Sequence, residues 1–131
     1  MKQSFFIIFC LILSYSIFAQ SDSIRGKQFQ LTATIIEKAQ LTPHCGNIAW
    51  GTVIKFKVTK IVGLNYPQEI IGIIITCPEF YKEGFFEIGK QYQVVFSDKN
   101  QADFGWVIPN KDLLKINNLA FDPYAVDVKK L

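Results

Sequence analysis

Few residues in this chain are of the kinds that most enzymes use for chemistry. Its 131 residues include one histidine and three cysteines. No pair of cysteines has the C-x-x-C spacing of a common zinc site. The chain also lacks a nucleophile elbow, a phosphate loop and a pair of carboxylates at an interpretable spacing. These absences argue against an enzyme, and no cofactor is expected.

A strong net charge is also lacking. The chain has 14 Lys and Arg against 11 Asp and Glu, which gives +3 at pH 7. Lys55, Lys57 and Lys60 come nearest to a basic cluster. Lys55 and Lys57 alternate with apolar residues, a pattern typical of the solvent face of a strand. Nucleic-acid binding requires a clustered basic face, so no nucleic-acid partner is expected.

A long apolar stretch occurs only at the start of the chain. Residues 1–19 read MKQSFFIIFCLILSYSIFA, with Lys2 before the apolar centre and Ala19 as a small residue at the end. This layout is typical of a secretory signal peptide. The apolar centre, Phe5 to Leu13, is shorter than the ~20 residues that span a bilayer. This length disfavours a membrane anchor, so a membrane is expected as a partner only through an uncleaved leader.

The leader predicts export, to the medium or to the periplasm. Cleavage is expected after Ala19, with cleavage after Gln20 as the alternative, which leaves one domain over residues 20–131. Phe9 stands before Cys10, where lipid attachment needs a small residue, so lipidation is not expected. No internal repeat, low-complexity tract or Gly/Ser linker divides the remaining chain.

Cysteine parity changes when the leader is removed. Cys10 leaves with it, and Cys45 and Cys77 remain as an even pair in an oxidising compartment, which favours a disulfide between them. The alternative is functional. His44 stands next to Cys45 and would make that thiol a candidate nucleophile, or a zinc ion would be held by His44, Cys45, Cys77 and Glu79.

The secondary structure is expected to be mainly β. Five strands are predicted, over residues 29–36, 52–62, 70–76, 91–96 and 104–108. Ile54, Phe56 and Val58 are expected to face the core. The last two strands are expected to form a hairpin, and Pro78 ends the third strand because proline gives no N–H to a sheet. Gly72 suits a strand buried on both faces or a bend at a barrel corner.

The remaining segments are expected to be helical or loose. The connection over residues 79–89 leaves room for one helical turn. Asn110 is a candidate cap for a short helix that runs through Lys115, and Asp122-Pro123 is a possible helix start. Residues 126–131 are expected to be loose at the chain end.

Three stretches resemble the netrin-like domain, the OB-type barrel shared by the tissue inhibitors of metalloproteinases and several secreted modules. They are FKVTKIVG, IIITC with its terminal cysteine, and FFEIGKQYQVVF, in which a glycine precedes a strand with a tyrosine. The resemblance covers residues 28–108. It implies a small five-stranded OB-like barrel with one or two short helices. Those inhibitors begin with a metal-chelating cysteine and carry several disulfides, which this chain lacks, so protease inhibition is not implied.

The most favoured function is a secreted or periplasmic, non-catalytic binding module, with a protein or a glycan as partner. OB-type barrels bind through a sheet face and its neighbouring loops, and the candidate contact residues are Trp50, Phe80, Tyr81 and Trp106. Phe85 and Phe86 are expected to plug the end of the barrel. The alternative is a small exported thiol- or metal-dependent enzyme that uses His44, Cys45 and Cys77.

Overall fold

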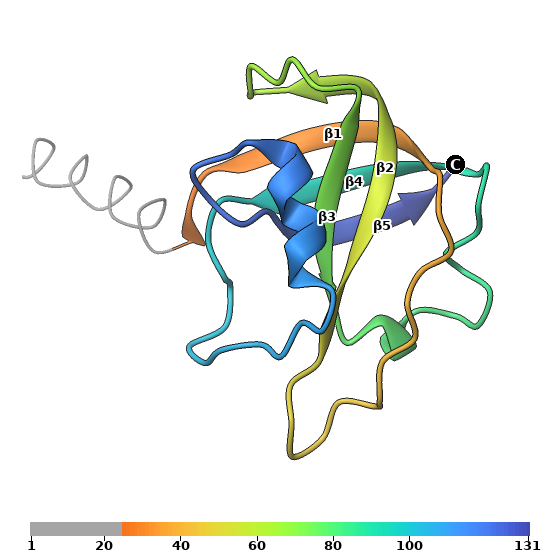
Figure 1. Ribbon diagram of the computed structural model, residues 1–131, viewed down its shortest axis with the longest axis vertical. Helices are drawn as coiled ribbons and strands as arrows, with labels where there is room; N and C mark the ends of the chain where they lie inside the picture. Colours follow the sequence, from red (N-terminus) through yellow and green to blue (C-terminus); the bar gives the residue numbers. More distant parts are fainter. Residues whose placement is uncertain (1–24) are drawn as a thin grey trace, which may run out of the picture.

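Five strands close into a small barrel, as the sequence predicts. The computed structural model describes residues 25–131, so the expected leader lies outside the described part of the chain. The elements in chain order are β1 (Gln28–Ile35), β2 (Gly51–Val62), β3 (Ile70–Thr76), the 3₁₀ helix η1 (Pro78–Phe80), β4 (Gln91–Ser97), the 3₁₀ helix η2 (Lys111–Asn117) and β5 (Tyr124–Lys130). Around the barrel the strand order is β1-β2-β3-β5-β4 (Figure 1), which is compatible with an OB-like fold. Within residues 25–131, no helix has the length and apolar character that a bilayer crossing requires.

The core comes from the alternation of apolar residues along β1, β2 and β4. Ile54 and Phe56 are at most 1% exposed, and Val58 packs against the same cluster. On β4, Tyr92 and Phe96 are fully buried, and the Phe56 and Tyr92 rings meet edge to face at 6.2 Å. Successive strand residues point to opposite faces, so every second residue on these strands is left for the outer surface.

The predicted fifth strand at residues 104–108 is wrong. Only Val107 takes part in a ladder there, in an isolated bridge with Trp50. The fifth strand is β5, where the sequence suggests a helix start and a loose chain end. Its inward residues, Ala125 and Val128, are three apart because the β4–β5 register shifts between Val95 and Phe96. This bulge breaks the period of two on which strand prediction depends.

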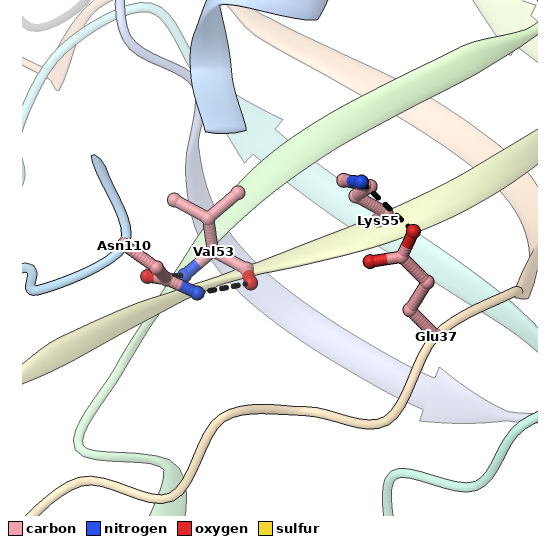
Figure 2. A network of polar contacts seen from close by, with 4 residues as sticks. All are labelled: Glu37, Val53, Lys55 and Asn110. Atoms are coloured by element: carbon pink, nitrogen blue, oxygen red, sulfur yellow. Dashed lines mark hydrogen bonds and ion pairs between the residues drawn. The ribbon is translucent and has the colours of Figure 1, made fainter. Parts of the chain in front are cut away.

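The short helix after Asn110 is confirmed, although as the 3₁₀ helix η2, and Asn110 does not cap it with its side chain. Its side-chain amide instead binds β2, where the Oδ1 atom accepts from Val53 N–H at 2.9 Å and the Nδ2 group donates to Val53 C=O at 2.9 Å (Figure 2). This part of β2 extends beyond its pairing with β1, which ends at Phe56. Asn110 therefore replaces a neighbouring strand at Val53.

Asn117, at the other end of η2, makes the equivalent contact with β3. It accepts from Gly72 N–H at 2.7 Å and donates to Gly72 C=O at 2.8 Å, and it is 2% exposed. The β3–β5 ladder consists of one residue pair, Ile74 with Tyr124, so it does not reach Gly72. Two asparagines thus satisfy the strand edges that the barrel leaves open, since an unpaired buried backbone group is costly.

Gly72 allows η2 to lie directly on the outer face of β3, where Figure 1 shows the blue helix in front of this strand. A Cβ atom at this position would lie 2.9 Å from Val53 Cγ1 and 3.4 Å from the Leu113 carbonyl oxygen. Val53 and Ile74 are buried on the same outer face. Of the two expectations for Gly72, the structure has the strand buried on both faces.

Replacement of Asn117 tests this closure. Asn117→Ala leaves the Gly72 N–H and C=O groups buried without partners, which is expected to lower the free energy of unfolding by about 1–3 kcal/mol. Lys115→Ala on the same helix removes an exposed side chain and its surface ion pair with Asp112, and it is expected to change the free energy of unfolding by less than about 0.5 kcal/mol. Urea denaturation followed by tryptophan fluorescence measures both variants. Equal midpoints for the two would contradict the role given to Asn117.

Candidate functional site

The predicted disulfide between Cys45 and Cys77 is present. The two Cα atoms lie 5.7 Å apart, and the cysteines are 32 residues apart in sequence. Cys45 belongs to the long loop before β2, and Cys77 directly follows β3. The bond therefore fixes this loop against the end of the β2–β3 hairpin, at the lower end of the barrel in Figure 1.

Cys77 is the point where the chain leaves the sheet. Its N–H still donates to the Trp50 carbonyl oxygen at 2.9 Å, as the last bond of the ladder. Its backbone then adopts the left-handed conformation, with φ of 44°, and Pro78 begins η1. A residue other than glycine adopts this conformation at a cost, and the disulfide helps to hold it there. The strand stops at this cysteine as the sequence predicts.

Glu79 joins the disulfide to the loop before β2. One carboxylate oxygen accepts a hydrogen bond from the Cys45 N–H group, and the other is buried with no hydrogen-bond partner among the described residues. The two sulfur atoms and a Glu79 oxygen lie within 4.8 Å of one another. Of the predicted metal set, three members are therefore together, whereas His44 is exposed and lies outside the group. Metals bind the thiolate form of cysteine, and both sulfurs are in the disulfide.

The two tryptophans lie on neighbouring segments beside the disulfide. Trp50 is partly buried, and its backbone N–H donates to Cys45 Sγ at 3.3 Å. It bridges to Val107, which brings the loop after β4 to the same place. Trp106 is also partly buried, and its ring nitrogen donates to Asn100 Oδ1 at 2.9 Å. The Trp50 backbone and the Trp106 indole are thus held by hydrogen bonds, and both residues are only partly buried.

Tyr81, Phe85 and Phe86 form a plug against the core instead of an exposed surface. Their ring centroids are 4.9–5.0 Å apart, and both phenylalanines contact Tyr92. The Tyr92 hydroxyl donates to the Phe85 carbonyl oxygen at 2.5 Å and accepts from the Glu87 N–H at 2.8 Å. Burial, with a smaller effect of nearby Asp127, raises the pKa of Tyr81. Tyr81 therefore offers only part of its ring to a partner.

Five exposed apolar side chains lie on the loops that the disulfide and the Trp50–Val107 bridge tie together. We call this surface the disulfide end. Phe80 is 80% exposed and Leu41 is 88% exposed. The members are Leu41, Ile48, Phe80, Phe104 and Val107. Sequence reasoning identified only Phe80 among them, because an apolar residue in a loop has no periodicity that separates an exposed position from a buried one.

A shallow groove lies beside β2, around Lys55. Its volume is about 400 Å³, and it is lined by Ile36, Glu37, Lys55, Gln68, Glu69, Ile70 and Ile116. Lys55 Nζ and a Glu37 carboxylate oxygen form an ion pair at 2.8 Å there (Figure 2). This pairing neutralises the lysine, and the lining has no histidine, cysteine or serine that would act as a nucleophile.

Comparison with known protein families, with curated proteins and with solved structures finds no match. Only the strand order of the closed barrel therefore supports an OB-like fold. The disulfide is consistent with an extracellular or periplasmic location, where such bonds persist.

Serine variants test how the disulfide stabilises the domain. Cys45→Ser and Cys77→Ser are each expected to lower the free energy of unfolding by about 3–4 kcal/mol, because either one releases the same closed loop. The double variant is expected to lose no more than a single one, since the effects of two partners in one bond do not add. His44→Ala, at the exposed neighbouring position, is the control. Additive losses in urea denaturation would contradict a shared bond.

Proposed function

We propose that this chain is an exported, non-catalytic binding module that recognises a partner protein through the disulfide end. Export rests on the leader in residues 1–19 and on the disulfide, which suits an oxidising compartment. The choice of a binding role rests on the few chemically active residues and on their arrangement. Both thiols are bonded to each other, and the single histidine is exposed outside their cluster.

Exposure of Phe80 is the observation that carries the proposal. A phenylalanine side chain that is 80% exposed gains the favourable free energy of burial only when something covers it. Phe80 is the last residue of η1, three residues after Cys77, and its N–H donates to the Cys77 carbonyl oxygen at 3.0 Å. Aromatic anchors on rigid supports are typical of interaction hot spots, and this backbone is tied to the disulfide.

The neighbouring loops support the same surface. Ile48 and Phe104 are about half exposed, at 49% and 52%, and each lies within two or three residues of a tryptophan that is held by hydrogen bonds. Trp50 and Trp106 are partly exposed on the same loops and would add contact area beside these apolar side chains. Apolar and aromatic side chains of this kind form the buried core of protein interfaces.

The netrin-like resemblance is the finer part of the proposal. Two features support it. The chain forms a five-stranded barrel in which a cysteine follows the third strand, and the strand after Gly89 carries a buried tyrosine, Tyr92. A secreted binding role fits that group of domains. The described chain has one disulfide, and the region that would hold the cysteine-led N-terminus of the inhibitors lacks a cysteine, so protease inhibition is not proposed.

A thiol- or metal-dependent enzyme is the alternative, and the cluster of Cys45, Cys77 and Glu79 is the observation in its favour. It requires the disulfide to be open, because only a free thiolate attacks a substrate or binds a metal. The bond is closed in the structure, and this is the reason to prefer the binding module.

Partner capture with matched variants tests the proposal. The tagged wild-type chain is added to material from its own export compartment, cross-linked and recovered, and Phe80→Ser is compared with Ile88→Ser. Ile88 is also exposed, at 58%, but lies outside the disulfide end. A partner protein recovered in stoichiometric amount with wild type and Ile88→Ser, and lost with Phe80→Ser, is the expected result. Recovery that is the same for all three chains would contradict the assigned surface.

A further inference from the structure

A second surface lies on the outer faces of β2, β1, β4 and β5, away from the disulfide end. The registers place Lys60 opposite Thr32, Thr32 opposite Gln93, and Gln93 opposite Lys129. One row of side chains thus crosses four neighbouring strands, with a lysine at each end. Adjacent strands are ~4.8 Å apart, so the two lysines are separated by about 14 Å along the sheet.

One neighbouring row has the same kinds of side chain. Lys57 lies opposite Thr34, and Thr34 lies opposite Gln91. In the row on the other side, Val62 lies opposite Gln30, Gln30 opposite Val95, and Val95 opposite Asp127, so two valines border the polar surface there. We call the complete surface the four-strand face. Its polar members are Gln28, Gln30, Thr32, Thr34, Lys57, Lys60, Gln91, Gln93, Asp127 and Lys129.

The four-strand face has a net positive charge. Lys57, Lys60 and Lys129 are exposed, and none forms an ion pair with another described residue. Asp127 is the single acid against these three lysines. By contrast, Lys55, Lys111 and Lys130, which lie outside the face, each form an ion pair with an acid. The face is therefore complementary to an anion.

The side chains between the lysines indicate what kind of anion fits. The outward glutamines and threonines make no side-chain hydrogen bond to any part of the chain that the structure describes, so their donors and acceptors are free. Amide and hydroxyl groups pair with sugar hydroxyls in both directions. None of the residues in the three rows is aromatic, and unpaired bases are recognised by stacking on aromatic side chains. The chemistry matches a sugar polymer better than a nucleic acid.

We propose that the four-strand face binds an acidic polysaccharide. The lysines at the ends of the Lys60–Thr32–Gln93–Lys129 row pair with carboxylate or sulfate groups, and the glutamines and threonines bind the hydroxyls between them. This surface goes beyond the binding module proposed above, because it shares no residue with the disulfide end.

Affinity electrophoresis tests this with defined polymers: polygalacturonate as the acidic polysaccharide, dextran as a neutral one and duplex DNA as a different polyanion. Retardation of the wild-type chain by polygalacturonate, and not by dextran, is expected. Lys60→Gln/Lys129→Gln is expected to weaken this binding about tenfold, as for the loss of exposed ion pairs. The control, Lys82→Gln/Lys115→Gln, changes the net charge equally at exposed positions outside the face and is expected to bind like wild type.

A further variant separates recognition from charge. Gln93→Leu keeps every lysine and is expected to weaken polygalacturonate binding several-fold, because the central amide of the row is lost. Absence of retardation by polygalacturonate, an equal loss in the control pair, or equally strong retardation by DNA would overturn the proposal. Phe80→Ser is expected to leave polygalacturonate binding unchanged, so failure here is distinguishable from failure of the partner-protein proposal.

Discussion

The disulfide between Cys45 and Cys77 is the constraint on which the loops at one end of the barrel depend. It joins the loop before β2 to the end of β3 across 32 residues, and the Glu79 carboxylate and the Trp50–Val107 bridge attach further segments to it. Segments without regular structure otherwise lose conformational freedom when they bind. Because these links restrain the loops, their exposed apolar side chains are available to a partner at a lower entropic cost.

Much of the barrel was predictable because inward and outward residues alternate along β1, β2 and β4. The residues that close the barrel were not. The bulge opposite Val95 hides the inward pair Ala125 and Val128 from a search for period two. Asn110 looks like a helix cap in the sequence, whereas its amide binds Val53 on a strand 57 residues away. Contacts between a side chain and a distant backbone leave no local pattern.

The candidate site was predictable to a different extent. The Cys45–Cys77 bond was predicted from cysteine parity, with Cys10 assigned to the expected leader and an oxidising compartment assumed. Which aromatic residues are exposed could not be read from the sequence. Tyr81 packs in the plug, whereas its neighbour Phe80 is exposed. The lysine row across four strands depends on register between strands, which a single sequence does not specify.

The redox state of Cys45 and Cys77 in the native compartment tests the central claim most directly. Intact-mass analysis of the exported protein, alkylated with and without prior reduction, counts the free thiols. The account predicts no alkylation without reductant and two alkyl groups after reduction, as for one closed disulfide. Two alkyl groups without reductant, or a stoichiometric metal released on denaturation, would contradict it and would favour a thiol or metal site built from Cys45, Cys77 and Glu79.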